Sequence, residues 1–418
     1  MRDTELYQQI LGINTPWKVE RVELVIADKR VEIHLTHKVE ATWACPTCGK
    51  TMPLYDHSDQ RSWRHLDTCQ LQTFLHASVP RVECTEHGVG QVSVPWALPH
   101  GRFTALFERW IIDVLHETGT VSGAVALLGI TWDEGWGVMD RAVKRGQKRK
   151  VAKVIEHLGV DEKAFRKGHS YVTVVCDIDN ATVEHVADDR KADSLGAYLG
   201  GLSEKQLWGI KAIAMDMWDP YFKAVCEHVP LGEYRIVFDR FHIMKHMGDA
   251  VDKVRRHEHL EFKAAGGKDA EKLKGARHLF LYAQENVPAE KRSKLRELLR
   301  DNLRVGRAWA WKESLRELWS YTTEGWARRF FSDWYAGAIR SRLEPVKKVA
   351  RMLKSRLENI VSYCRYPITN GVAEGLNSKI MTIKRKACGF ANREHFKTAI
   401  YFHCGGLSLY PEPSPGIG

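Results

Sequence analysis

The chain has 418 residues, 44% hydrophobic and 28% charged, so it is long enough for roughly two to four domains with apolar cores. Its net charge of +11 favours a polyanionic partner, because Lys and Arg gain affinity by releasing counterions from phosphates. The sequence has no apolar stretch long enough to span a bilayer and no signal-peptide core, which argues against a membrane or secreted protein.

The segment 1–97 predicts a small β domain. Alternating apolar and polar residues over 18–36 predict a β-hairpin, and 71–80 and 90–95 predict further short strands. The nine cysteines are an odd number and only some of them cluster. That pattern favours metal binding in a reducing cytoplasm over a disulfide framework.

Two chelating motifs lie in this β domain. Cys45 and Cys48 are separated by two residues and followed by Gly, and Cys84 and His87 repeat the spacing. Four such ligands suit a tetrahedral structural Zn²⁺, so we predict a zinc-binding domain. Three residues between the two motifs are alternatives for one of these four ligands. They are Cys69, His57 and His65, which we otherwise interpret as ordinary surface or half-buried residues.

Helical periodicity starts at Phe103 and predicts three short helices in a domain over 98–150. The second helix covers 121–128 and the third covers 134–145, with a tight turn between them. This order is typical of a helix-turn-helix that binds double-stranded DNA. The basic residues that we expect to contact DNA phosphates from this domain are Lys144, Arg145, Lys148, Arg149 and Lys150.

Residues 151–256 predict alternating strands and helices. Three consecutive strands over 154–165, 170–178 and 182–187 precede two strand–helix pairs. Three antiparallel strands followed by alternating strands and helices match the order of a ribonuclease H-like α/β core. We therefore predict a multidomain α+β protein built around such a core.

Residues 257–365 predict only helices and form an expected all-helical insertion in that core. The core would resume over 366–410, and the Pro-rich end at 411–418 predicts a disordered tail. We expect the tryptophans of the insertion to be core residues rather than base-stacking platforms. They are Trp309, Trp311, Trp319, Trp326 and Trp334.

Three acidic residues occur at the positions in the predicted core where a metal site for phosphodiester cleavage would need them. Asp161 lies in the first strand of the core, Asp216 directly follows an apolar strand, and Glu374 starts a helix. Carboxylates from separate elements commonly hold two Mg²⁺ (or Mn²⁺) ions. Asp177 and Asp179 compete with Asp161, which we favour because the first strand of such a meander lies centrally, beside the strand that carries Asp216.

Several motifs follow one another along nearly the whole chain. They are Cys-Pro-x-Cys-Gly at 45–49, Gly-Val-Asp-Glu at 159–162, Asp-Met-Trp-Asp-Pro-Tyr at 216–221, Asp-Arg-Phe-His at 239–242 and Asn-Gly-x-x-Glu-Gly-x-Asn at 370–377. As an ensemble they resemble the bacterial insertion-sequence transposases of the ISL-three family. No single motif is specific.

The resemblance implies a DDE-type transposase with Asp161, Asp216 and Glu374 as its metal-binding triad. It also implies a catalytic His242, within an Asp-x-x-His signature. The alternative is a helix N-cap at Asp239 with His242 on the first turn. The second zinc motif is Cys-x-x-His here, where the family resemblance leads one to expect Cys-x-x-Cys, so the fourth zinc ligand stays open.

We therefore predict an enzyme that binds the terminal inverted repeats of an insertion sequence. It would cleave by two-metal phosphodiester hydrolysis and join the 3′ ends to target DNA, as a homodimer or larger assembly in the bacterial cytoplasm, associated with the nucleoid. The alternatives are an inactive transposase-derived DNA-binding regulator and a nuclease of similar fold. The basic residues after Glu374 that we expect to hold DNA are Lys379, Lys384, Arg385 and Lys386.

Overall fold

A computed structural model describes residues 2–166, 170–189, 191–266, 269–301 and 303–412 of this mixed α+β chain. Two compact units share the chain: Met1–Val151 with Thr382–Gly418, and Ala152–Met381. Across the described ranges, no helix is both long and apolar enough to cross a membrane. Residues 413–418 of the predicted disordered tail lie outside the described residues.

The first unit starts with a short helix, α1 (Asp3–Ile10), and a β sheet. The predicted hairpin forms as β1 (Trp17–Val25) and β2 (Arg30–His37), which pair antiparallel. The sheet order is β1-β2-β6-β5, with β6 (Leu71–Cys84) paired to β5 (Asp56–Thr68). Helix α1 and strand β5 were not predicted. In β5, mostly polar residues lie on an exposed face, which hides the strand periodicity.

Three capped helices follow: α2 (Ala105–Thr118), α3 (Val121–Leu128) and α4 (Trp132–Arg149). Thr104, Thr120 and Thr131 cap their N-termini through side-chain oxygens. The first two helices end at glycines in the left-handed conformation, which lets the chain turn sharply. This matches the predicted helix-turn-helix arrangement.

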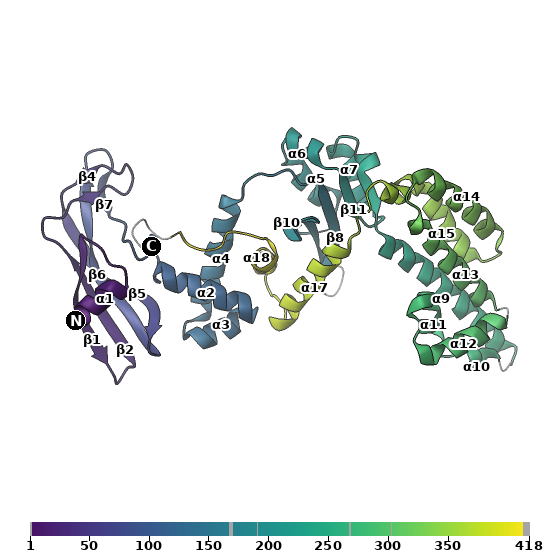
Figure 1. The fold of residues 1–418 in the computed structure, drawn as a ribbon, viewed down its shortest axis with the longest axis horizontal. Helices are drawn as coiled ribbons and strands as arrows, with labels where there is room; N and C mark the ends of the chain where they lie inside the picture. The colour runs from purple at the N-terminus through teal and green to yellow at the C-terminus, as the bar shows by residue number, and fades with distance from the viewer. Residues whose placement is uncertain (1, 167–169, 190, 267–268, 302, 413–418) are drawn as a thin grey trace. The chain divides into compact units, whose positions relative to one another are not determined.

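A fourth helix from the end of the chain completes this helical domain. Helix α18 (Arg393–Cys404) packs beside α4, although the two are far apart in the sequence (Figure 1). Phe402 and Leu409 are buried in the same apolar cluster as the residues of α2 and α4. From the sequence we predicted that residues 366–410 belong to the ribonuclease H-like core. The contacts of α18 lie instead with the first unit.

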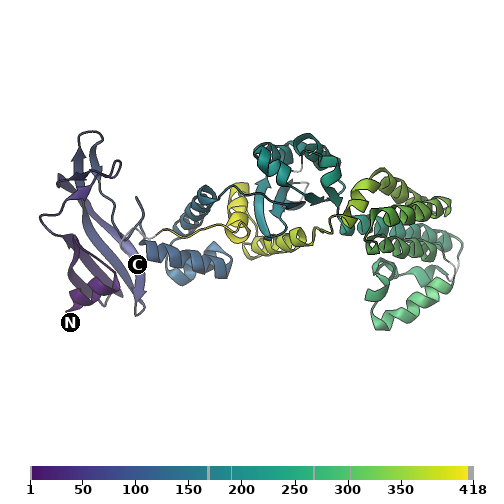
Figure 2. The same ribbon diagram turned by 45° about the horizontal axis from the view of Figure 1, so that its top comes forward.

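The second unit contains a five-stranded sheet in the order β10-β9-β8-β11-β12. The strands β8 (His157–Arg166), β9 (Ser170–Asp177) and β10 (Thr182–Ala187) are antiparallel neighbours. The short strands β11 (Ala212–Met215) and β12 (Ile236–Phe238) run parallel to β8. Figure 2 gives a second view of this sheet and of the helices around it.

Apolar side chains from β8, β11 and β12 share one core with the surrounding helices. Helices α5 (Ala192–Gly200) and α7 (Asp219–His228) pack against each other and contribute to this core. Helix α17 (Gly371–Lys386) makes hydrogen bonds to residues of β8. The remaining short helices beside the sheet are α6 (Glu204–Gly209) and α8 (Gly232–Arg235).

The described residues of 257–365 contain helices and no strand, as predicted. The helices from the core into this insertion are α9 (Arg240–Ala264), α10 (Asp269–Leu273), α11 (Arg277–Leu281), α12 (Ala289–Arg300), α13 (Arg304–Arg316), α14 (Glu324–Arg340), α15 (Glu344–Ser355) and α16 (Leu357–Val361). Trp309, Trp319 and Trp334 are buried, and Trp311 packs against the core. Trp326 departs from the prediction, since it is 60% exposed.

Candidate active site and zinc cluster

Three neighbouring strands bring aspartates to one face of the sheet. The apolar residues that lie opposite one another in the β8–β11–β12 register, all in the core, are Val160, Met215 and Phe238. Side chains alternate between the faces of a strand, so the next residue along each strand points to the other face. Those residues are Asp161, Asp216 and Asp239. Sheet register therefore gathers carboxylates that are far apart in the sequence.

Helix α17 adds Glu374 to this face. Burial raises the pKa of Glu374, and the carboxylates of Asp239 and Asp161 raise it further, against a lowering effect of His242. Burial also raises the pKa of Asp161, and the carboxylate of Asp216 adds to that rise. Asp161 therefore lies within electrostatic range of both Asp216 and Glu374.

The hydrogen-bond donors to these acids are uncharged. Asp161 accepts from the backbone N–H of Glu162 at 2.7 Å and from the side-chain amide of Asn377. Asp216 accepts from the N–H of Met217 at 2.6 Å. In the described part of the chain, no Lys or Arg forms an ion pair with Asp161, Asp216 or Glu374. Lys163 and His242 act on Asp161 and Glu374 through their charge alone, without such an ion pair.

His242 and Asp239 form a pair beside the acids. The Asp239 side chain caps α9 by accepting from the N–H of His242, and the same carboxylate lies 3.0 Å from His242 Nδ1. The Asp239 hydrogen bond raises the pKa of His242 despite its burial, with added contributions from Asp216 and Asp161. Asp239 therefore caps α9 while His242 lies close to the acids. The helix-cap interpretation of this motif and the interpretation of His242 as a catalytic residue are compatible.

Two buried asparagines belong to the motif at 370–377 but had no predicted role. Asn377 is 1% exposed and donates to Asp161 from the same helix as Glu374, three residues further along. Asn370 is fully buried and donates to the carbonyl of Val160 at 3.3 Å. Its side-chain oxygen would lie 3.1 Å from a Cβ at Gly159, so glycine there permits the close approach. The spacing of three from Glu374 could have identified Asn377, since such residues share a helix face.

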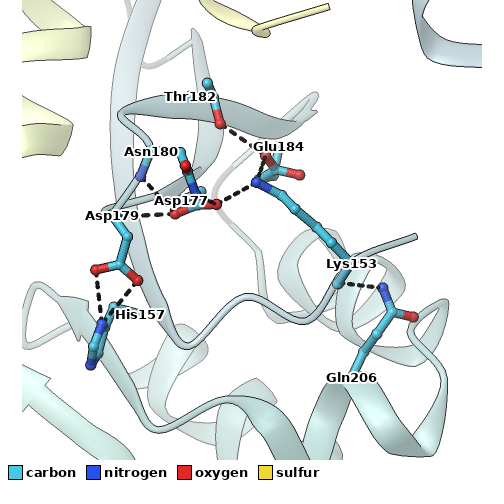
Figure 3. Close-up of polar contacts among 8 residues, drawn as sticks. All are labelled: Lys153, His157, Asp177, Asp179, Asn180, Thr182, Glu184 and Gln206. Carbon is cyan, nitrogen blue, oxygen red and sulfur yellow. Dashed lines mark hydrogen bonds and ion pairs between the residues drawn. The ribbon is translucent and has the colours of Figure 1, made fainter. Parts of the chain in front are cut away.

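Asp177 and Asp179 lie away from the acid cluster. Asp161 pairs with Val174 of β9, whereas Asp177 pairs with Leu158, roughly 10 Å away along the strands at about 3.3 Å per residue. Lys153 donates to Asp177 at 2.6 Å, and Asn180 donates to it at 2.8 Å (Figure 3). His157 lies 2.9 Å from Asp179. These acids are held by groups of the protein itself.

The predicted zinc ligands converge in the first unit. The ligand atoms of Cys45, Cys48, Cys84 and His87 all lie within 4.8 Å of one another. Among the described residues, no other group of His, Cys, Asp or Glu side chains has its possible ligand atoms this close together. The carboxylate oxygens of the acid cluster are therefore farther apart than the ligand atoms of this group. Thiolate and imidazole donors suit tetrahedral Zn²⁺.

The local backbone forms both zinc-binding turns. The first lies between the paired two-residue strands β3 (Trp43–Ala44) and β4 (Thr51–Met52), and the second lies between β6 and β7 (Gly88–Gln91). Gly49 and Gly88 have positive φ values of 73° and 70° at the ends of the two turns. The alternative ligands are engaged or placed elsewhere: His65 contacts Thr104, His57 contacts His37, and Cys69 lies in the β5–β6 turn.

The predicted DNA-contacting residues of α4 differ in exposure. Lys144 has a 73% exposed side chain and pairs with Asp140, and Lys148 and Lys150 are exposed. Arg145 is only 14% exposed and donates to Glu108 and to the carbonyl of Leu409. Arg149 donates to the carbonyl of Tyr410. The prediction for Arg145 is therefore corrected: its guanidinium holds the C-terminal segment onto the helical domain.

The second basic set lies on α17, after Glu374. Arg385 and Lys386 are exposed, and Lys384 is half-buried. Lys386 donates one hydrogen bond to the carbonyl of Thr118 at 3.3 Å. The last helical turn therefore carries several cations.

Comparison with protein families explains this combination of modules. An ISL3 family profile, described as "Transposase", matches residues 158–400, more than half of the 418 residues. The chain belongs to the ISL3 family of insertion-sequence transposases. A profile described as the zinc-finger of transposase IS204/IS1001/IS1096/IS1165 matches residues 41–87 of this ISL3 transposase. The helix-turn-helix profile of transposase family ISL3 matches residues 92–143.

Curated relatives are similar along nearly their whole length. The transposase for insertion sequence element IS1001 of Bordetella parapertussis is 28% identical over 406 residues, covering 95% of this chain and 97% of the relative. The transposase for insertion sequence element IS1557 of Mycobacterium tuberculosis is 26% identical over 420 residues, covering 93% of each. The ISL3 transposase thus combines a zinc finger and a DNA-binding helix-turn-helix with a transposase region, as its sequence motifs predicted.

Proposed function

We propose that this ISL3 transposase cleaves the ends of an insertion sequence and joins the 3′ ends to target DNA at the acid cluster of its second unit. The observation that supports the proposal is the register of β8 and β11, in which Met215 pairs with Val160, so that Asp161 and Asp216 are the next residues along the two neighbouring chains. The effect of Asp161 on the pKa of Glu374 supports adding Glu374 of α17 to the same cluster. We infer that these three carboxylates hold two Mg²⁺ or Mn²⁺ ions.

The donor set fits such ions. Asp161, Asp216 and Glu374 offer only oxygen ligands, which Mg²⁺ prefers. The raised pKa values of Asp161 and Glu374 reflect burial and mutual repulsion, both of which a divalent cation would offset. When bound, a pair of ions activates the attacking oxygen and stabilises the leaving oxygen of a phosphodiester.

The sheet order supports a ribonuclease H-like core. Three antiparallel strands occupy one side and two parallel strands the other, in the order β10-β9-β8-β11-β12. In this arrangement Asp161 lies in the central strand and Asp216 follows the strand next to it. The helical insertion then separates Asp216 from Glu374 in sequence.

The surrounding residues orient the cluster. The amide of Asn377 donates to Asp161 and fixes the rotamer of that carboxylate, so we assign Asn377 as a positioning residue. Asp239 holds the Nδ1 side of His242, which favours the protonated ring. A protonated His242 next to the acids can donate to a non-bridging oxygen of the scissile phosphate.

The first unit would recognise the terminal inverted repeats. Exposed Lys144, Lys148 and Lys150 suit contacts to the DNA backbone, and exposed Arg385 and Lys386 at the end of α17 suit further contacts of this kind. We infer that the Cys45, Cys48, Cys84 and His87 group holds a structural zinc ion. Pairing of two ends calls for a homodimer or a larger assembly on DNA.

A test uses duplex DNA carrying one labelled transposon end, incubated with the protein and Mg²⁺. The proposal expects nicked or cut ends and, with added target DNA, products in which the labelled 3′ end is joined to the target. Binding without cleavage would instead identify an inactive regulator. Cleavage without joining would identify a nuclease of similar fold.

The zinc assignment has its own test. The Cys84→Ala variant should bind less than a tenth of the wild-type zinc, measured by metal analysis of the purified protein, because three ligands hold zinc far more weakly than four. The matched control is Cys69→Ala, a cysteine in the β5–β6 turn outside the cluster, which should retain full zinc. Full zinc in the Cys84 variant would refute the assignment.

A further inference from the structure

The first unit contains a cavity of about 570 Å³ within its helical domain. Its lining comes from the start of α3, from α4 and from residues 383–403, all of which belong to that unit. Cavities of this size hold small organic groups when aromatic walls are combined with a few polar groups. The acid cluster of the second unit contributes nothing to it.

One wall is a cluster of three aromatic rings. The indoles of Trp132 and Trp136 stack with centroids 5.7 Å apart and an interplanar angle of 8°. The tilted His395 ring lies 4.0 Å from that of Trp136 and 6.1 Å from that of Trp132. Trp132 is 43% exposed, so the cluster presents an accessible indole. A flat aromatic group can stack on such an indole.

The lining also contains a cation. Lys386 lines the cavity, and its ammonium donates a hydrogen bond to the carbonyl of Thr118 at 3.3 Å. An ammonium group has three N–H donors, so others remain for an anion. The neighbouring Arg385 is exposed on the same turn. The cavity therefore combines a stacking surface with a cationic group.

We propose that this cavity binds one unpaired nucleotide of a DNA strand, with its base stacked on Trp132 and its phosphate next to Lys386. An aromatic wall alone would suit many apolar groups. A wall combined with a cation suits a ligand that has both a flat ring and an anion, and a nucleotide has both. The helix-turn-helix around the cavity already brings DNA to this domain. The inference depends on DNA binding and not on the acid cluster, so it can be tested without cleavage.

The test measures binding of the full chain to three fluorescent DNA probes without added Mg²⁺. The probes are a 20-base duplex, the same duplex with one unpaired 2-aminopurine, and the corresponding single strand. Base–aromatic stacking contributes roughly 1–3 kcal/mol, so Trp132→Ala should weaken binding of the probes with unpaired bases by about 5- to 100-fold. Binding of the plain duplex should change by less than about twofold.

Three companion variants sharpen the result. Trp132→Phe should retain most of the affinity, because it keeps an aromatic ring at this position. Lys386→Ala should weaken the same two probes and reduce the salt dependence of binding by about one ion. Trp326→Ala, which removes an exposed tryptophan of the other unit, should leave all three probes unchanged.

A separate readout does not rely on a folded variant. In the wild-type complex the fluorescence of the unpaired 2-aminopurine should be quenched by stacking. Absence of quenching would overturn the proposal, as would an equal loss of duplex and unpaired-base binding in Trp132→Ala. Unchanged binding of every probe to Trp132→Ala would overturn it as well. A protein that binds these DNA probes but fails to cleave DNA would count against the proposed function. The inference about the nucleotide-binding cavity would still stand.

Discussion

The β8–β9 pair carries two buried aspartates in opposite electrostatic settings. Opposite the start of β8, Asp177 is 1% exposed and lies 2.6 Å from the ammonium of Lys153, with further hydrogen bonds from Asn180 (Figure 3). In the middle of β8, Asp161 is 9% exposed and accepts only from neutral donors, including Asn377.

The difference separates structural carboxylates from candidate metal ligands. Burial raises the pKa of Asp177, but the bonds from Lys153 and Asn180 outweigh it and leave that pKa below its ordinary value. For Asp161 the effect of burial exceeds the effects that lower the pKa, so its pKa lies above the ordinary value. The Asp216 carboxylate raises it further. A buried acid that the protein has already neutralised needs no cation, whereas an acid cluster without such partners does.

Loss of one acid of the acid cluster should have the largest effect. Asp216→Asn keeps the shape and removes the charge, so DNA cleavage with Mg²⁺ should fall by about 1,000-fold or more. Binding of end DNA should stay within about twofold of wild type. Cleavage at the wild-type rate in this variant would remove Asp216 from the site.

Asp177→Asn is the matched control at the other buried aspartate. The folded fraction of this variant should cleave end DNA at the wild-type rate, since Asp177 lies away from the acid cluster. A 1,000-fold loss of cleavage in well-folded protein would reverse the comparison between the two aspartates.

Removal of the positioning amide should have an intermediate effect. Asn377→Ala frees the Asp161 carboxylate, so the Mg²⁺ concentration for half-maximal cleavage should rise by about 10- to 100-fold. Saturating Mg²⁺ should restore most of the rate, which a general loss of folding would not allow. A lowered rate with an unchanged Mg²⁺ requirement would argue against this role.

Loss of the buried ion pair should affect stability rather than chemistry. Asp177→Ala leaves Lys153 without its nearest partner and breaks the bonds from Asn180, so the free energy of unfolding should fall by about 2–3 kcal/mol. Urea unfolding followed by circular dichroism measures this change. A stability equal to wild type would mean that Asp177 is not a structural group.

The exposed pair near Asp177 should have the smallest effect. The side chains of His157 and Asp179 are 23% and 49% exposed, so their ion pair is well solvated. Asp179→Asn should lower the free energy of unfolding by less than about 0.5 kcal/mol in the same assay. A loss as large as that of Asp177→Ala would show that solvent exposure does not separate the two acids.

Local sequence patterns predicted most elements near the acid cluster. The strand carrying Asp216 is a short apolar run, and the zinc ligands follow from the spacing of Cys45, Cys48, Cys84 and His87. These features depend on neighbouring residues, which a sequence displays directly. The family motifs added Glu374, whose approach to β8 no local pattern indicates.

Features that depend on distant contacts were not predictable in this way. Strand β5 escaped detection because polar residues dominate it, and its pairing with β6 defines it instead. Arg145 looks like a DNA-binding residue in a basic run, yet Glu108 and the chain end at Leu409 engage it. Asn377 gained a role only once α17 was placed on β8.

The most direct test is a crystal structure with Mn²⁺ and a cut transposon end, using anomalous scattering to locate the ions. Manganese should be coordinated by the carboxylates of residues 161, 216 and 374. Manganese bound instead at residues 177 and 179, or a cut DNA end held away from all three carboxylates, would contradict it.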